Sequence, residues 1–411
     1  MDAIIERCCG IDVHKKTIVA CLMIGKPQEK PKATIKTFST MTRDILACKD
    51  WLESEGCTHV ALESTGVYWK PVYNIMEASM EIILANARDI KNLPGRKTDV
   101  KDCEWIADLL RHGLIKGSFI PPKPIRELRD LTRYRQKLIQ QRSSELNRIQ
   151  KFLEDANIKL SSVVTDITGV SATDMIHHLI CNDMTPKEMS KLAKGRLRKK
   201  ISELEKSLEG YLTDHHRFIL TTSIQMIASY DYAIEKLDAE IDKKMEPFQE
   251  TSERLQTIPG VKKKTAETII SEIGVNMSQF PSHAHLSSWA GVSPGNNESA
   301  GKRYGGKTTP GDKWLKGGLS EAAWAASKTK GTYLQAKYKR LVSRCGKKRA
   351  CVAVGHTILI IAYYIIKEQV IYNELGGDFF DRLNEEYLVK RLKTRIQNLG
   401  YQVLIKKEIA A

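Results

Sequence analysis

The feature that most constrains the fold is a hairpin pattern followed by short apolar strands that alternate with helical segments. Two apolar, β-branched runs are joined by the turn-like residues 14–16, which is typical of a β-hairpin. The expected strands are residues 8–13, 17–24, 33–39, 59–63 and 81–85, and the expected helices are 42–55, 67–80 and 98–112. This order predicts an α/β domain over residues 1–122, with a mixed sheet and helices on its faces.

Three prolines, Pro121, Pro122 and Pro124, mark the end of this domain. We expect a helical coiled-coil region with a basic insertion over 123–248 and a mostly α-helical domain over 249–345. A helical extension over 346–411 closes the chain.

Apolar residues recur every seven positions in the second part of the middle region. They are Leu220, Ile227, Ile234 and Ile241. This spacing favours a coiled-coil arm or an antiparallel helical pair. Two helices of an ordinary bundle fit the same spacing equally well, so both interpretations stay open.

The overall charge favours a polyanionic partner. The 411 residues carry a formal charge of +16, which is typical of nucleic-acid binding, although acidic membranes attract such chains too. No signal peptide is recognisable in residues 1–9. The longest apolar run, 351–366, is interrupted by Gly355 and His356 and is short for a membrane crossing, so we expect a buried helix. Nine cysteines without C-x-x-C spacing argue against a zinc ribbon and for a cytoplasmic protein.

Four acids occupy positions suited to metal binding. Asp12 and Glu63 end two expected strands, and Asp99 and Asp102 lie three residues apart on one expected helix, hence on one face. Carboxylates are the hard ligands that Mg²⁺ prefers, and Mg²⁺ supports phosphoryl transfer. Acids at strand ends and on helices are also common as simple surface or ion-paired residues. The competing partners are three lysines, Lys15, Lys16 and Lys97.

Residues 255–274 resemble a helix-hairpin-helix. A Pro-Gly turn at Gly260 precedes three lysines and an amphipathic helix, and such a turn offers backbone N–H groups to a DNA phosphate. The lysines are Lys262, Lys263 and Lys264. An ordinary pair of helices joined by a turn is the alternative.

Residues 290–306 read as a flexible, polar and basic loop with Ser299 at its middle. A serine hydroxyl attacks phosphorus when it is activated, but a loop serine is usually a turn residue. Three neighbouring cations, Lys302, Arg303 and Lys307, are candidate phosphate ligands.

Taken together, these motifs closely resemble the DEDD insertion-sequence transposases, recombinases guided by a bridge RNA. The matching motifs are GID ending at Asp12, ESTGVYW from Glu63, KTDVKD with Asp99 and Asp102, IPGV, and NNESAGKRYGGKTTPGDKWL around Ser299. The resemblance covers residues 7–155 and 250–330, and it does not reach 158–218 or the tail after 370.

The resemblance implies a RuvC-like, RNase H-like first domain whose four acids bind Mg²⁺, and a Ser299 nucleophile that forms a covalent phosphoserine link to DNA. It also implies donor and target DNA, a guide RNA, and dimers that assemble into a tetramer in which the acids of one subunit meet the serine of another. A nucleoid-associated location in a bacterial or archaeal cytoplasm follows. The alternatives are an RNase H-like or Holliday-junction-type nuclease without a serine step, and a nucleic-acid-binding scaffold.

Overall fold

The computed structural model describes residues 3–64, 66–86, 90, 102–295, 297–305 and 308–405. Side chains of 297–299 and 303–305 lie outside this description. The chain forms two compact units, Met1–Ile120 and Pro121–Ala411. The finer division of residues 123–411 into three domains stays a prediction.

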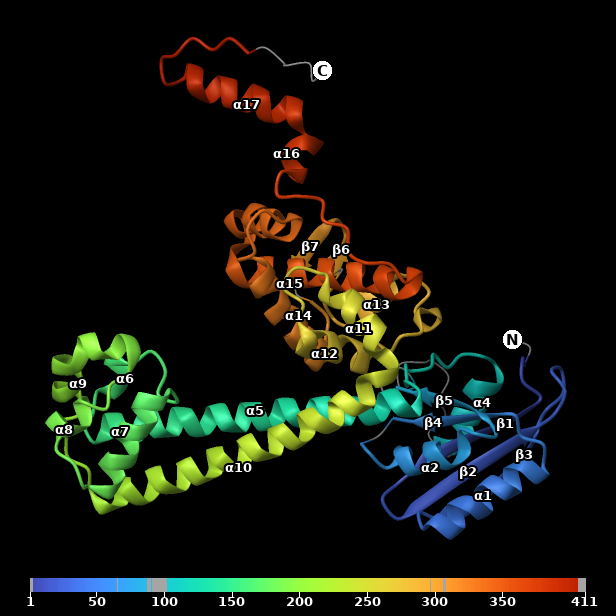
Figure 1. The fold of residues 1–411 in the computed structure, drawn as a ribbon. Coiled ribbons are helices and arrows are strands. Elements are labelled where there is room, and N and C mark those ends of the chain that lie inside the picture. The colour runs from blue at the N-terminus through green and yellow to red at the C-terminus, as the bar shows by residue number, and fades with distance from the viewer. Residues whose placement is uncertain are drawn as a thin grey trace. The chain divides into compact units, whose positions relative to one another are not determined.

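A five-stranded mixed sheet forms the centre of the first unit (Figure 1). Its strands are β1 (Arg7–Val13), β2 (Thr17–Ile24), β3 (Lys32–Ser39), β4 (His59–Glu63) and β5 (Glu81–Ala85). They lie in the order β3-β2-β1-β4-β5. β2 runs antiparallel to β1 and β3, whereas β4 runs parallel to β1 and β5. The predicted α/β class and the mixed sheet are therefore confirmed.

Alternation along the strands builds a core on each face of this sheet. On one face, Ile11 and Leu62 pack with residues of α1 (Thr42–Ser54) and α2 (Trp69–Met76). On the other face, Cys8 and Ala61 pack with α4 (Asp102–Arg111) through Cys103, Ile106 and Ala107. Successive strand residues point to opposite faces, so position parity decides which residues meet α4.

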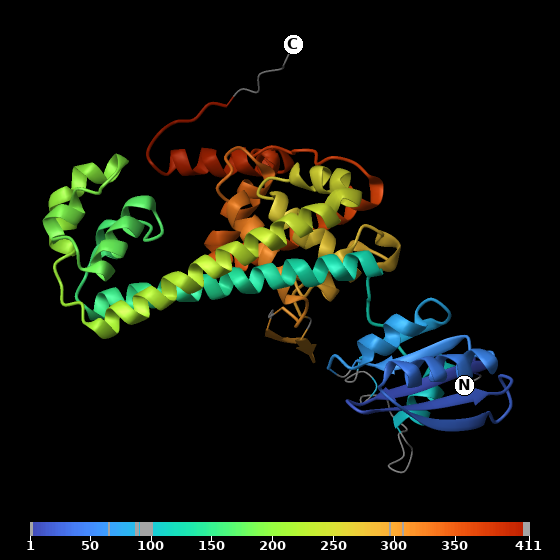
Figure 2. The same cartoon turned by 60° about the horizontal axis from the view of Figure 1, so that its bottom comes forward.

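Two long helices, α5 (Lys123–Asp155) and α10 (Asp214–Met245), lie side by side in the second unit (Figure 1, Figure 2). Ion pairs join Arg142 to Asp231, and Arg135 to Asp238. Later residues of α5 thus meet earlier residues of α10, which makes the pair antiparallel, one of the two expected arrangements. Coiled-coil packing stays a prediction, because Leu220 and Ile241 of the heptad series are buried while its middle members are half-buried.

A small helical insertion lies between α5 and α10 in sequence and has a core of its own. It contains α6 (Leu160–Val163), α7 (Val170–Cys181), α8 (Pro186–Ser190), the 3₁₀ helix η1 (Gly195–Lys200) and α9 (Ile201–Ser207). Its apolar residues pack with Ile149 and Leu153 near the end of α5 and with Leu220 near the start of α10. The insertion therefore sits at the end of the helical pair away from α11–α15 (Figure 1).

The remaining helices and a β-hairpin follow α10. They are η2 (Glu246–Phe248), α11 (Gln249–Gln256), α12 (Lys263–Ile273), η3 (Met277–Gln279), α13 (His283–Trp289), β6 (Asn297–Ser299), β7 (Lys302–Gly305), α14 (Lys313–Ala326), α15 (Tyr333–Glu368), α16 (Phe379–Leu383) and α17 (Glu385–Gln397). By length and composition alone α15 is able to cross a membrane. Half of its most apolar window is buried, with Ile358 and Leu359 inaccessible to solvent, as in the core helix of a folded domain.

Candidate functional site

The sheet register brings Asp12 and Glu63 to neighbouring strand ends. In the parallel pair β1 and β4, Ile11 lies opposite Leu62, and the two acids are the next residues on their strands. Ile11 and Leu62 point into the core under α1 and α2. Because side chains alternate, Asp12 and Glu63 belong to the opposite face, which α4 covers.

A close approach of α4 to β1 adds the third acid. A Cβ atom at Gly10 would stand 2.3 Å from both the carbonyl oxygen of Cys103 and the amide nitrogen of Ala107. Only glycine tolerates such contact, so α4 lies directly on the strand. Asp102 is the first residue of α4 in the described chain, and it interacts electrostatically with Asp12. Gly10 was not predicted from the sequence to have a packing role, although a glycine inside a strand signals close packing.

The environment of Asp12 disfavours its negative charge. Burial raises the pKa of its carboxyl group, His14 opposes this effect from 3.0 Å, and the charges of Asp102 and Glu63 raise the pKa further. The partner of Asp12 is thus His14, rather than either of the lysines, Lys15 and Lys16, that follow it in sequence. Like-charged carboxylates that face one another in this way are stabilised by a bound cation.

Three of the four acids that were predicted to bind the metal ion lie within the described residues. Asp12, Glu63 and Asp102 share one region, whereas Asp99 lies outside the described residues, as does Lys97. Within the described ranges, no group of three or more histidine, cysteine, aspartate or glutamate side chains is arranged to hold a metal ion. The complete magnesium site therefore stays a prediction.

Ser299 ends a β-strand rather than sitting in a flexible loop. It pairs with Lys302 across the antiparallel strands β6 and β7. The two residues between them, Ala300 and Gly301, have φ values of 50° and 74°, the left-handed conformation of a tight hairpin turn. Lys302 is exposed, while the side chains of Ser299 and Arg303 and all of Lys307 lie outside the description. The expectation of a loop was wrong because the Ala-Gly pair supplies turn geometry that links two short strands.

Lys316 of α14 holds the base of this hairpin together. Its ammonium group donates to the Gly291 carbonyl at 3.0 Å and to the Thr308 hydroxyl at 2.7 Å. The backbones of Gly291 and Gly311 also touch, since a Cβ at Gly311 would stand 2.3 Å from the Gly291 nitrogen. The segments before and after the hairpin are therefore fixed to each other and to α14.

A buried ionic network connects the hairpin base to the long helix α5. Arg133 of α5 donates to both carboxylate oxygens of Glu272 at 2.7 Å and to Asp312 at 2.7 Å. Asp312 also caps α14 by accepting from the backbone N–H groups of Trp314 and Leu315. Burial raises the pKa of Glu272, and the hydrogen bond from Arg133 opposes that rise. This network was not anticipated from the sequence.

The predicted DNA-binding turn lies between α11 and α12. Gly260 has a φ of 89°, and a Cβ there would stand 2.3 Å from the carbonyl oxygen of Ala322 in α14, so tight packing alone requires a glycine. Lys263 pairs with Asp242 at 2.5 Å, Lys264 pairs with Asp238 at 3.4 Å, and Lys262 is exposed. Two helices joined by a turn are thus observed, and DNA contact by Gly260 and the lysines stays a prediction.

Two family models match the chain. The model of the IS110-type DEDD transposases, described as "Transposase", matches residues 9–158. A second model, described as "Transposase IS116/IS110/IS902 family", matches residues 252–339. The first match contains the acidic positions and the second contains Ser299. No curated protein matches the chain.

Proposed function

Since this chain belongs to the IS110-type transposases, enzymes that cut and rejoin DNA, we propose that it works with two chemical groups: acids that hold Mg²⁺, and the hydroxyl of Ser299. The observation that carries the proposal is that Asp12 and Glu63 end neighbouring parallel strands on the sheet face covered by α4. The described part of α4 begins with Asp102, whose charge acts on Asp12. The strand order β3-β2-β1-β4-β5 is compatible with an RNase H-like domain.

The donor set suits magnesium. Asp12, Glu63 and Asp102 offer hard oxygen ligands, and their mutual repulsion is the electrostatic condition that a divalent cation relieves. Asp99 would complete the set. When bound, Mg²⁺ supplies electrostatic stabilisation of the charge that develops during phosphoryl transfer. His14, at 3.0 Å from Asp12, orients that carboxylate from the solvent side.

The serine step exchanges one phosphoester for another. The Ser299 oxygen forms a bond to a DNA phosphorus atom and loses its proton, one bridging P–O bond breaks, and the departing sugar oxygen takes up a proton. Attack by a sugar hydroxyl of the partner strand on the same phosphorus reverses the step, releases the serine and joins the strands. No net oxidation or hydrolysis occurs. The exposed Lys302 opposite Ser299 provides positive charge for the phosphate.

Assembly and guidance follow from the resemblance to the DEDD transposases. We propose that the α5–α10 pair dimerises and that dimers form tetramers, so that the acids of one subunit meet Ser299 of another. A guide RNA would select donor and target DNA by base pairing, loosely parallel to other guided systems. Digestion of RNA that co-purifies with the protein is then expected to abolish sequence-specific recombination while leaving non-specific DNA binding.

The decisive experiment is capture of a covalent protein–DNA adduct with end-labelled DNA in the presence of Mg²⁺. We expect the adduct in the unmodified protein and in the control Ser293→Ala, and none in Ser299→Ala. Strand cutting that persists in Ser299→Ala but disappears in Asp12→Asn would replace the proposal with a nuclease that has no serine step. Salt-sensitive binding without Mg²⁺-dependent chemistry would indicate a scaffold.

A further inference from the structure

The insertion carries a dense cluster of positive charge, here called the tip segment, residues 187–200. It contains seven cations and a single carboxylate, a surplus of six positive charges in a short stretch. The cations are Lys187, Lys191, Lys194, Arg196, Arg198, Lys199 and Lys200. A surface with such a surplus of positive charge is either an ordinary solvated surface or a binding face. The contacts that the seven cations make within the chain distinguish these two possibilities.

The backbone of the tip segment is anchored. The Lys194 amide donates to the Ser171 hydroxyl at 2.9 Å, and its ammonium group pairs with Asp174 at 3.0 Å. Lys200 donates to the Val163 carbonyl at 3.2 Å, and Leu197 packs against the core of the insertion. Two cations and one leucine thus hold η1 in place, so the other cations project from a fixed support.

The remaining five cations make no ion pair within 4.0 Å among the described residues, although the charge of Lys191 helps to lower the pKa of the adjacent Glu188. They are Lys187, Lys191, Arg196, Arg198 and Lys199, all exposed. In the described parts of the chain, no carboxylate lies within 4.0 Å of any of their charged groups. Charge left unpaired on an ordered surface is available to an external anion.

The long helices behave differently. Arg142 pairs with Asp231, and Lys244 pairs with Glu127 at 2.7 Å. Their cations are therefore partly neutralised by facing carboxylates, whereas in the tip segment only Lys194 makes an ion pair among the described residues. Along α5, the twenty residues from Arg135, which bonds α12, to Asp155 span about 30 Å. The charge is thus concentrated well away from α12.

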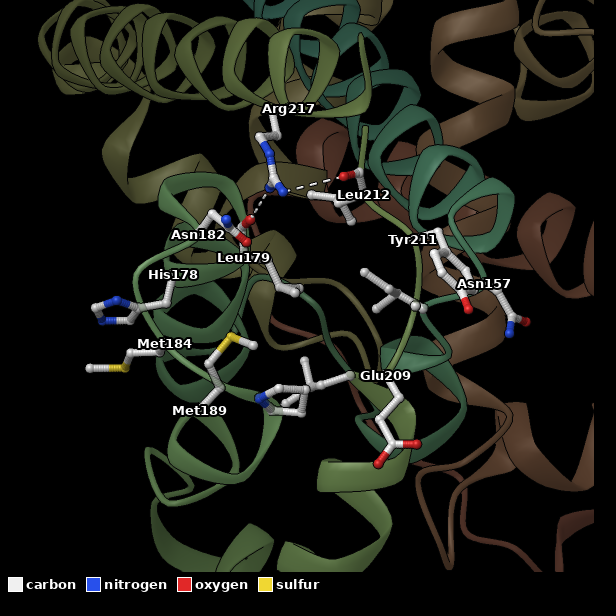
Figure 3. Close-up of a pocket in the computed structure, with 14 residues that line it drawn as sticks. Asn157, His178, Leu179, Asn182, Met184, Met189, Glu209, Tyr211, Leu212 and Arg217 are labelled. Carbon is white, nitrogen blue, oxygen red and sulfur yellow. Dashed lines mark hydrogen bonds between the residues drawn. The ribbon is translucent and has the colours of Figure 1, made fainter. Parts of the chain in front are cut away.

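A small-molecule anion or a membrane fits this site poorly. The neighbouring cavity of about 660 Å³ contains Arg217, but that side chain donates to the carbonyls of Leu179 and Leu212 (Figure 3). Among the apolar side chains of the tip segment, Met189 and Ala193 are buried, and Leu192 and Leu197 are partly buried against the core of the insertion. Membrane-surface segments instead expose apolar anchors beside their cations.

We propose that the tip segment binds the phosphodiester backbone of nucleic acid, without reading its sequence. The proposal uses the membership of the chain in a transposase family and does not depend on Mg²⁺ or on Ser299. Backbone contacts by lysine and arginine release counterions, so each lost contact lowers the steepness with which affinity falls as salt rises. This slope is the quantity to measure.

The test compares binding of the full-length protein to duplex DNA and to a structured RNA with the same number of phosphates, over a salt series without Mg²⁺. For Arg196→Gln/Arg198→Gln/Lys199→Gln we expect the slope of log affinity against log salt to fall by roughly 2 to 3, with binding about 10-fold weaker. Loss with DNA alone or RNA alone identifies which nucleic acid the tip contacts, and either result supports the proposal.

The matched control removes three cations elsewhere in the same region, Arg148→Gln/Lys159→Gln/Lys206→Gln. Two of these cations already have carboxylate partners, Glu145 and Glu154. Equal slopes for the two triple variants on both nucleic acids would overturn the proposal. Thermal melting checks that each variant is folded. If the first triple variant unfolds, Lys187→Gln/Lys191→Gln replaces it, and we expect its slope of log affinity against log salt to fall by about 1 to 2. Because the salt series measures binding alone and contains no Mg²⁺, its outcome is independent of the serine step and is distinguishable from failure of the serine mechanism.

Discussion

Gly10 of β1 and Ala107 of α4 touch through their backbones: a Cβ on Gly10 would stand 2.3 Å from the Ala107 amide nitrogen. This contact sets how closely α4 lies on the sheet. Because Asp102 begins the described part of α4 and Asp12 lies two residues after Gly10, the same contact controls how near the two carboxylates come. The packing of Gly10 against α4 thus controls the repulsion between Asp12 and Asp102 in the candidate metal site.

We therefore predict that Gly10→Ala destabilises the protein by roughly 2 to 3 kcal/mol, since neither backbone is free to move away from the added methyl group. DNA cleavage should decline as well, because Asp102 is displaced from Asp12. Urea denaturation measures the first effect. Gly117→Ala is the control, where the added Cβ meets Ile83 at an ordinary 3.5 Å. Equal unfolding free energies for the two variants would contradict the packing argument.

For Asp12→Asn we predict opposite effects on stability and on activity. Burial and like charges raise the pKa of Asp12 in the folded state. Its favourable contribution to stability is therefore present at low pH and is lost as pH rises through the folded-state pKa. At neutral pH without metal, the variant should be at least as stable as the unmodified protein.

Stabilisation by Mg²⁺ in thermal melts should disappear in Asp12→Asn, and DNA cleavage should fall at least roughly 100-fold. Asp50→Asn, which removes an exposed carboxylate of α1, is the control and should keep both properties. Unchanged Mg²⁺-dependent stabilisation in Asp12→Asn would remove Asp12 from the metal site.

The Arg133 network should be costly to break. Arg133→Ala leaves the carboxylate of Glu272, whose side chain is only 1% exposed, with Arg129 as its remaining cation. We expect a loss of about 3 kcal/mol in the free energy of unfolding. Arg142→Ala on the same helix breaks the exposed pair with Asp231 and should cost under about 1 kcal/mol. Chemical denaturation of both variants shows whether the buried Arg133–Glu272 pair contributes more to the free energy of unfolding than the exposed Arg142–Asp231 pair.

The turn between α11 and α12 requires Gly260 for two reasons, its backbone conformation and its contact with α14. Gly260→Ala should destabilise the protein by more than about 3 kcal/mol, because it combines a φ of 89° with a clash against Ala322. Gly274 has a φ of 71° and a ψ of −171°, a backbone conformation that other residues rarely adopt, but open space surrounds it, so Gly274→Ala should cost less, roughly 1 to 3 kcal/mol. Similar losses in the two variants would mean that backbone conformation, rather than contact with α14, explains the glycine.

The local pattern of apolar and polar residues was sufficient to predict most strands and helices of the first unit. The expected strands at 17–24, 59–63 and 81–85 agree with β2, β4 and β5. Of the helix expected at 98–112, α4 covers Asp102–Arg111, and the expected residues 98–101 lie outside the described part of the chain. The hairpin at Ser299 was missed because its strands are too short for an alternating pattern, and the left-handed Ala300 is not a residue that signals such a turn.

The sequence by itself determined the α/β class of the first unit, the long helices and the transposase family, because side-chain periodicity and motif spacing are properties of neighbouring residues. Only the tertiary structure decided that the charge of Asp102 acts on Asp12 and that Arg133 ties α5 to the base of the Ser299 hairpin. It also decided that five cations of the tip segment make no ion pair with any described carboxylate. Those relationships depend on which distant backbones pack closely, and hence on steric contacts such as that of Gly10 with α4, which no local pattern encodes.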